Sequence, residues 1–405
     1  MPGSVESDEV LRHAPPAALA EALRASRKDT LRTFAAYRRA LPELRVPQRA
    51  TLNPPLWELG HIGWFQEHWL ARNPQRALGA RADPDATRSA PLREGADALY
   101  DSSRVAHGRR WSLPLPDADA TLADLEGQLA ATLALLASTP HEDEALYFFR
   151  LALAHEDMHH EAALYMAQTL GIDVERPRAP PPAPASTGEL QLPAARFRLG
   201  SSAAGFAFDN ELGAHELDLG AFRIDRRARR WGDVLPFVEA GGYLQPQWWS
   251  REGLAWLQAS GLQHPRPLRR AGKGWQLRVG SGWQPLDLDA PACHLSAHEA
   301  AAWCTWAGRR LPSEAQWERA AIEAPEAFAW GEVWEWTASP FQPYPGFVAH
   351  PYRDYSAPWF DGRPVLRGAS FATSARLRHP RYRNYFTAER NDIFAGLRSC
   401  PAHLP

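Results

Sequence analysis

The segment Arg176-Pro-Arg-Ala-Pro-Pro-Pro-Ala-Pro-Ala-Ser-Thr-Gly188 separates two parts of this chain that differ in composition. Its prolines stiffen the backbone, and it contains no large apolar side chain that could build a core. We therefore interpret residues 176–188 as a semi-rigid linker. The chain of 405 residues is also long for one domain, since domains commonly hold about 100–200 residues. Two domains are predicted, at residues 1–175 and 189–405.

The overall composition is that of an ordinary globular protein. Apolar residues make up 45% of the chain and charged residues 23%, which argues against a disordered or collagen-like protein. The net charge of -2 gives no reason to expect nucleic acid or an anionic membrane as a partner. The acidic N-terminus lacks a signal-peptide pattern, and no run of about 18 apolar residues could cross a membrane. With only three cysteines, we expect no disulfide framework and predict a cytoplasmic protein.

Before the linker, apolar residues recur at helical spacing in four stretches. The first covers about residues 16–41, and the second begins after Asn53, a capping residue followed by two prolines. The third covers about 119–138 and the fourth 143–170, where Gly171 is a usual stop signal. Four helices of this length with one long connection predict a four-helix bundle.

After the linker, short apolar pieces alternate with Gly and Pro, and most of the 17 tryptophans occur there. We expect strands at 190–199 and 216–224 and short helices at 232–240, 296–308 and 312–321. Long irregular stretches join these elements. The pattern predicts a loop-rich α+β domain, and periodicity does not specify its topology.

The 15 histidines of the chain include a group with metal-ligand spacing. His155 and His159 are four residues apart in the fourth predicted helix, so both imidazoles leave the same face about one turn apart. A third ligand is expected from His61, in the apolar second helix, because metals in helical bundles are bound by side chains of facing helices. Glu161 is expected to orient a ligand histidine or to help shape the site. The alternatives without a metal are that His155 and His159 are a solvated pair and that His61 is a histidine of the core.

Three neutral nitrogens with open positions suit either a hydrolytic zinc or a non-haem iron that binds oxygen. The zinc-protease pattern H-E-x-x-H is absent, because three residues separate His155 from His159. This spacing weakens the hydrolase interpretation, although zinc stays an alternative.

Motifs along the whole chain, taken in order, resemble the sulfoxide synthases of ergothioneine biosynthesis. In the first part they are Pro54–Trp69 around His61 and the run His155–Glu161, and in the second part Phe208–Glu211, Gly241–Tyr243, Trp303–Gly308, Arg310–Glu318, Val333–Ser339, Tyr344–Phe347, Leu366–Phe371, Arg383-Asn384 and Gly396–Arg398. The resemblance implies a DinB-like four-helix bundle followed by a formylglycine-generating-enzyme (sulfatase-modifying-factor) domain, related to C-type lectins.

The family resemblance also implies a reaction. An iron(II) enzyme uses molecular oxygen as co-substrate to join a chalcogen to the imidazole of hercynine, the trimethylated betaine of histidine. By position, His61, His155 and His159 would bind the iron. Tyr344, in Tyr-Pro-Gly-Phe, best matches the tyrosine that assists oxygen activation. The substrate contacts would come from Asn384, Tyr385, Phe386 and Met158, the last replacing a glutamine usual in the family.

One departure bears on the donor. Family members that use γ-glutamylcysteine or cysteine carry an arginine-rich connection, and here the corresponding residues His107-Gly-Arg-Arg-Trp-Ser-Leu-Pro114 lack its final arginine. Because arginines bind carboxylates, we expect a donor with fewer carboxylates. This favours the selenoneine synthase branch, which forms a carbon–selenium bond from a seleno-sugar. The alternative is a carbon–sulfur bond to γ-glutamylcysteine or cysteine.

Two competing classes are weaker. A formylglycine-generating oxidase needs a reactive cysteine near the Arg381-Tyr-Arg segment, where this chain has Asn384. A non-catalytic binding module would not need three intact histidines.

Overall fold

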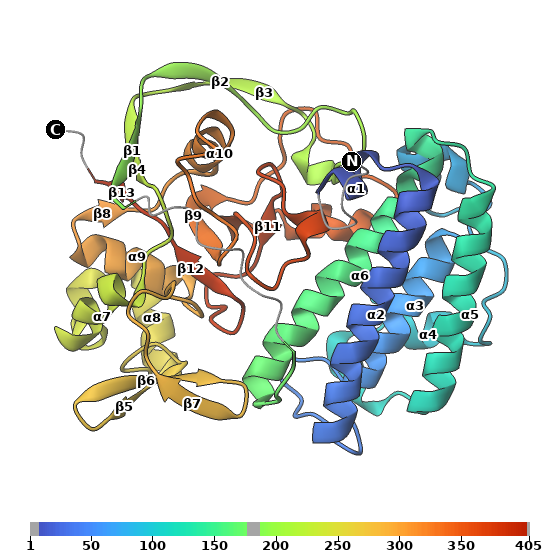
Figure 1. The fold of residues 1–405 in the computed structure, drawn as a ribbon, viewed down its shortest axis with the longest axis horizontal. Helices are drawn as coiled ribbons and strands as arrows, with labels where there is room; N and C mark the ends of the chain where they lie inside the picture. Colours follow the sequence, from blue (N-terminus) through green and yellow to red (C-terminus); the bar gives the residue numbers. More distant parts are fainter. Residues whose placement is uncertain (1–7, 176–186, 403–405) are drawn as a thin grey trace.

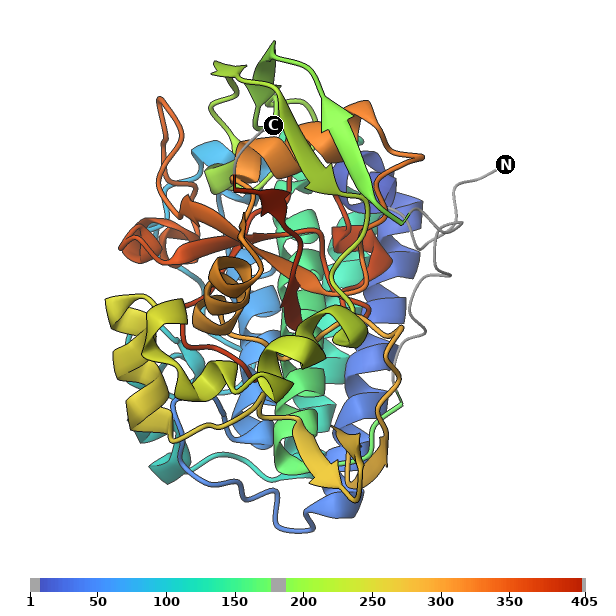
Figure 2. The ribbon, with the colours of Figure 1, turned by 90° about the vertical axis from the view of Figure 1, so that its left-hand side faces the viewer.

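The structure, a computed structural model, describes residues 8–175 and 187–402. Most of the predicted linker, residues 176–186, lies outside the described residues. All described strands follow residue 188, whereas the long helices precede residue 171. Figure 1 shows the long helices on one side and the strands and short helices on the other. Figure 2 looks onto the strand-containing part, with the long helices behind it.

Four long helices lie side by side in the first part (Figure 1). They are α2 (Pro16–Ala40), α3 (Pro55–Trp69), α5 (Ala118–Ala137) and α6 (Asp143–Leu170), and each overlaps a predicted stretch. The shorter helices α1 (Asp8–His13) and α4 (Ala96–Tyr100) and the 3-10 turns η1 (Arg76–Arg81) and η2 (His107–Ser112) were not predicted. Gly171 adopts a left-handed conformation, φ 73°, and ends α6 as expected.

Helix α3 is buried on nearly all of its faces. It lies between α5, α6 and the connection from 70 to 117, which contains α4 and η2. A helix that is apolar all round is stable only when neighbours cover every side. The polar groups on α3 therefore need partners inside the protein.

The second part contains several small sheets and one larger sheet. The central four-stranded sheet has the order β11 (Asn384–Tyr385), β10 (Pro364–Arg367), β9 (Trp334–Pro340) and β12 (Ala395–Leu397), and β12 runs parallel to β9. The smaller sheets pair β1 (Glu189–Leu192) with β4 (Phe222–Asp225), β2 (Ala195–Leu199) with β3 (His215–Leu219), β8 (Arg309–Arg310) with β13 (Cys400–Pro401), and β5 (Leu268–Ala271), β6 (Gly274–Val279) and β7 (Gly282–Pro285) with one another.

Helices α7 (Trp231–Glu239), α9 (Ala297–Trp306) and α10 (Glu314–Glu323) overlap the three predicted in this part. Each of the two predicted strands is instead a pair, because a turn separates β1 from β2 and another separates β3 from β4. Helix α8 (Arg251–Ser260) and the β5–β7 sheet were not predicted. The remaining 3-10 turns are η3 (Asp209–Glu211), η4 (Gly242–Leu244), η5 (Pro246–Trp248), η6 (Arg353–Tyr355), η7 (Ala357–Trp359) and η8 (Ala375–Leu377).

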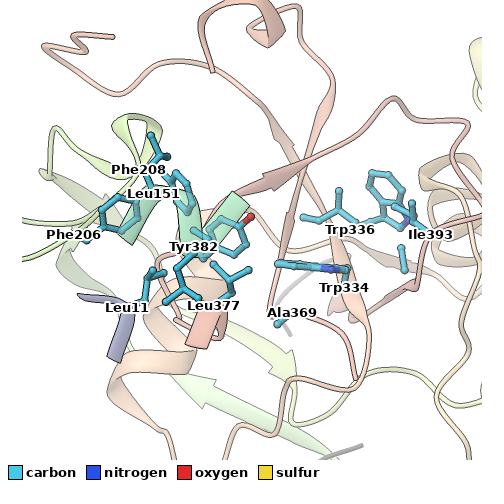
Figure 3. Packing of buried hydrophobic residues seen from close by; sticks show 14 of the residues in the cluster. Leu11, Leu151, Phe206, Phe208, Trp334, Trp336, Ala369, Leu377, Tyr382 and Ile393 are labelled. Atoms are coloured by element: carbon cyan, nitrogen blue, oxygen red, sulfur yellow. The ribbon is translucent and has the colours of Figure 1, made fainter. Parts of the chain in front are cut away.

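The largest apolar cluster joins the two parts. Figure 3 shows Leu11 of α1 and Leu151 of α6 close to Phe206, Phe208 and Leu377 of the second part. Polar contacts reinforce this interface. The buried carboxylate of Asp157 on α6 accepts hydrogen bonds from Ser26 of α2 (2.7 Å) and from Arg376 of η8 (2.7 and 3.0 Å).

Among the helices of residues 8–175 and 187–402, none combines the length and apolarity that crossing a bilayer requires.

Candidate metal centre and its pocket

Three histidines from two helices meet beside the second part. His61 lies in the middle of α3, and His155 and His159 project one turn apart from α6. The ring centroids are 5.0 Å apart for His61 and His155, 4.9 Å for His61 and His159, and 4.4 Å for His155 and His159. One nitrogen of each ring lies within 4.8 Å of those of the other two, the one such group of three found among the described residues.

Hydrogen bonds define which nitrogen two of these rings present. His61 Nδ1 lies 2.8 Å from the carbonyl oxygen of Tyr100, and His159 Nδ1 lies 2.6 Å from Glu58 Oε2. A carbonyl oxygen only accepts, so His61 Nδ1 carries the hydrogen and Nε2 has a free lone pair. The carboxylate of Glu58 imposes the same tautomer on His159. Such an oxygen partner behind a histidine is usual at metal sites.

His155 supplies the strongest sign that a ligand belongs here. Its side chain is 2% exposed and stacks on Phe65, with centroids 3.6 Å apart and planes 3° apart. Neither ring nitrogen has a hydrogen-bond partner among residues 8–175 and 187–402. Leaving a buried polar group unpaired costs about 1–3 kcal/mol, and a metal ion bound to one nitrogen would remove that cost.

Burial also keeps the rings in the form that binds metals. Desolvation, with the nearby His159 adding to it, lowers the pKa of His61 to about 3. Desolvation likewise places the pKa of His155 well below its ordinary value. Both imidazoles are therefore neutral at pH 7, as metal coordination requires. Imidazole nitrogens suit iron, zinc, copper or nickel, so the ligand set fits iron without selecting it.

The three histidines form part of the wall of a pocket of about 570 Å³ between the two parts of the chain. Helices α3 and α6 supply one side, and the second part supplies the opposite side. The other lining residues are Trp57, Ser102, Ser103, Arg110, Met158, Glu161, Ala162, Tyr165, Trp334, Tyr352, Asp354, Tyr355, Pro358, Trp359, Tyr382, Asn384, Tyr385, Phe386 and Ile393. The wall is mainly aromatic.

Some known proteins are similar to this chain over most of its length, and others only over part of it. Residues 177–332 match the family model of the sulfatase-modifying factor enzyme 1-like domain. A protein named hercynine oxygenase from Mycolicibacterium smegmatis is 31% identical over 88% of this chain and 92% of its own length. Its namesake from Mycobacterium tuberculosis is 32% identical over 86% and 90%. The chain belongs to the hercynine oxygenase family. It is accordingly an oxidoreductase, and the family resemblance drawn from the motifs is confirmed.

The formylglycine-generating enzymes are similar to only part of the chain. The enzyme of that name from Streptomyces coelicolor is 30% identical over 37% of this chain and 52% of its own length. That similarity belongs to the shared domain type. The family model of that domain type matches residues 177–332, which follow the helices that carry the three histidines.

The pocket contains most of the site residues expected from the sequence. Met158, Asn384, Tyr385 and Phe386 all line it. The thioether of Met158 lies 3.2 Å from the Tyr382 hydroxyl and 3.7 Å from the Tyr355 hydroxyl. Two tyrosines of the second part therefore contact α6 between His155 and His159.

The expectation for Tyr344 needs correction. Its side chain is buried outside the pocket, in a small cluster with Phe197 and Leu199. The hydroxyl lies 3.1 Å from Glu314 Oε2 and 3.1 Å from Arg367 Nη2. Tyr344 thus completes a buried acid–arginine network, because those charged groups need polar partners when water is excluded.

Tyr352 occupies the place expected of Tyr344. It lines the pocket, and its ring centroid lies 4.9 Å from that of Phe65 and 6.2 Å from that of His155. Burial raises the pKa of Tyr352, so the hydroxyl remains a proton donor. Sequence reasoning missed this residue. The spacing Tyr352-Arg-Asp-Tyr355 is its signal, since residues three apart in a 3-10 turn lie on one side.

Glu161 lines the pocket, but it does not orient a ligand histidine. Its carboxylate accepts hydrogen bonds from Trp334 Nε1 (2.8 Å), Ser370 Oγ (2.6 Å) and Thr373 Oγ1 (2.7 Å), all in the second part. None of its hydrogen bonds among the described residues goes to a histidine of the site. Glu58, which sequence analysis passed over, makes the contact expected of Glu161. A lone glutamate in the apolar stretch before His61 was the available signal.

Proposed function

We propose that this chain is a non-haem iron(II) enzyme that uses molecular oxygen to join a chalcogen donor to the imidazole of hercynine. The observation that carries the proposal is the pair of partnerless nitrogens on His155, buried beside the free Nε2 lone pairs of His61 and His159. The similarity to hercynine oxygenases along almost the whole chain supports the same substrate.

The three histidines would bind the iron, which would supply the activation of oxygen. The residues of the chain provide the surroundings. A pocket of about 570 Å³ has room for two small molecules, and its aromatic walls suit the trimethylammonium group of hercynine, since cations are attracted to aromatic faces. Asn384, Tyr385 and Phe386 are proposed to contact hercynine. Tyr352 is proposed to donate a proton or hydrogen bond toward the reacting atoms.

Two donor classes follow from the sequence, and different observations support them. The similarity to hercynine oxygenases favours the sulfur donors, γ-glutamylcysteine or cysteine, over the seleno-sugar that the sequence analysis ranked first.

The charge of the pocket favours the seleno-sugar. Among its described lining residues, Arg110 is the one arginine, and it shares the wall with the carboxylate of Asp354 and the hydroxyls of Ser102 and Ser103. A dipeptide with two carboxylates would find a single guanidinium there. A neutral, hydroxyl-rich donor fits this wall without an unpaired charge.

Product formation tests the proposal. Metal-free protein would be loaded with Fe(II) or with Zn(II) and mixed with hercynine and, separately, γ-glutamylcysteine, cysteine or a seleno-sugar. We expect a hercynine adduct by mass spectrometry from the iron form in air, and none from the zinc form or under argon. The donor that reacts selects between the two classes. Activity with stoichiometric zinc, or full activity of His155→Ala, would contradict the proposed metal site.

A further inference from the structure

A chain of hydrogen bonds connects one candidate metal ligand to the pocket arginine. His159 Nδ1 donates to Glu58 Oε2 (2.6 Å), and the Asn53 side-chain amide donates to Glu58 Oε1 (2.6 Å). The Asn53 Oδ1 atom in turn accepts a hydrogen bond from Arg110 Nη1 (2.9 Å). Each member therefore limits the position of the next.

Glu58 has little freedom within this arrangement. The residue is 6% exposed, and each carboxylate oxygen already has a partner. Water would therefore not easily take over the hydrogen bond that Glu58 accepts from His159. The other two histidines do not depend on a side chain in this way. A backbone carbonyl orients His61, and no group in the described part of the chain hydrogen-bonds His155.

Asn53 transmits orientation because its two ends differ. The amide nitrogen only donates and the oxygen only accepts. When the nitrogen of Asn53 faces the carboxylate of Glu58, its oxygen therefore faces the guanidinium of Arg110. Asn53 was expected to cap α3, but Pro54 occupies that position and the amide is free for this link. Arg110 is also held over the ring of Trp57, at 3.8 Å, and Trp57 stacks on His61, at 4.8 Å.

We propose that Glu58 is the positioning residue of His159 and that Asn53 couples it to Arg110, so that one hydrogen-bonded chain sets both the metal ligand and the cationic wall of the pocket. The inference rests on the proposed metal site. It adds that a group bound by Arg110 and the metal at His159 influence each other.

Cobalt(II) tests the inference without any reaction, because its absorption spectrum reports the ligands directly. Titration of metal-free Glu58→Gln is expected to show an affinity about 10–100-fold below that of the wild type, the usual effect of removing such a partner. The control is Glu67→Gln, a carboxylate on the same helix that is also 6% exposed and bonds Gln128 and the Leu92 amide. Its cobalt affinity is expected to stay within about 3-fold of wild type.

Asn53→Ala provides the second variant, since it leaves Glu58 in place. It is expected to weaken cobalt binding less than Glu58→Gln does, and to raise KM for the donor more than it changes kcat. Wild-type cobalt affinity and spectrum in Glu58→Gln would overturn the inference. If that variant does not fold, unchanged cobalt affinity together with unchanged donor KM in Asn53→Ala overturns it. If the wild type binds cobalt but forms no product when it is loaded with iron, that result would instead count against the proposed function alone.

Discussion

The hydrogen bonds accepted by Glu161 allow a test of how the two parts of the chain are held together. One buried carboxylate on α6 accepts three hydrogen bonds from the second part, through Trp334, Ser370 and Thr373. Glu161→Ala removes the acceptor of all three donors. The indole N–H of Trp334 is then left without a partner, while the two hydroxyls, which lie 3.2 Å apart, can turn toward each other.

The expected cost follows from these contacts. An unsatisfied buried donor costs about 1–3 kcal/mol, and a hydrogen bond to a charged group contributes about 1.5–3 kcal/mol. One unpaired indole N–H and two partly satisfied hydroxyls together give a loss of about 3–5 kcal/mol in the free energy of unfolding for Glu161→Ala. Glu161→Gln should cost only about 1–2 kcal/mol, because the amide oxygen can accept from Trp334 and the amide nitrogen can donate to Thr373. Burial, which raises the pKa of Glu161 despite its donors, further reduces the loss when the charge is removed.

Equilibrium unfolding in urea, followed by circular dichroism, measures these differences. All proteins should be metal-free, so that ligand binding does not contribute to stability. The control is Glu144→Ala, an exposed glutamate on the same helix, for which a change within about 0.5 kcal/mol is expected. The reasoning fails if Glu161→Ala unfolds within about 1 kcal/mol of wild type, or if Glu161→Gln is as unstable as Glu161→Ala.

Three further predictions concern the pocket and its supports. Tyr352→Phe should lower kcat about 100-fold, the usual contribution of a positioned proton donor, whereas Tyr344→Phe should leave kcat unchanged and lower stability; equal kcat losses would contradict the assignment. Burial lowers the pKa of His350 to about 4, so as the pH falls the unfolded chain takes up a proton before the folded protein does. The free energy of unfolding should therefore decrease as the pH is lowered from 6.5 to 4, by at most about 1.4 kcal/mol per pH unit. A His350→Gln variant with an unchanged pH slope would refute this. In Gly60→Ala the new methyl group would overlap the ring of Tyr100, whose carbonyl orients His61, and cobalt titration should show weaker binding than wild type.

Periodicity and turn residues were sufficient for the long helices. The apolar spacing and stop signals placed α2, α3, α5 and α6, because each of these helices buries a stripe or a whole surface that the pattern displays. Short elements behaved differently. The sheets β1–β4 and β5–β7 depend on turns and pairing partners, which a local pattern does not specify.

The three histidines illustrate what the sequence by itself determined. The spacing of His155 and His159 follows from helix geometry, and His61 stood out as a polar residue in an apolar stretch. The partners of these residues were decided by tertiary structure. Glu58 lies 101 residues from His159 in the chain, and no local signal pairs them. Glu161, two residues beyond His159, seemed the natural partner.

Tyr344 and Tyr352 show the same division. Both are tyrosines of one stretch of the second part, Tyr344 buried and Tyr352 partly buried, and composition does not tell them apart. The packing of Glu314 and Arg367 around Tyr344 encloses it in the core, while the docking of α6 brings Tyr352 to the pocket. Local sequence determined the helices and the three candidate metal ligands, because helix periodicity is a property of neighbouring residues. Only the contact between the two parts decided which distant side chains surround them.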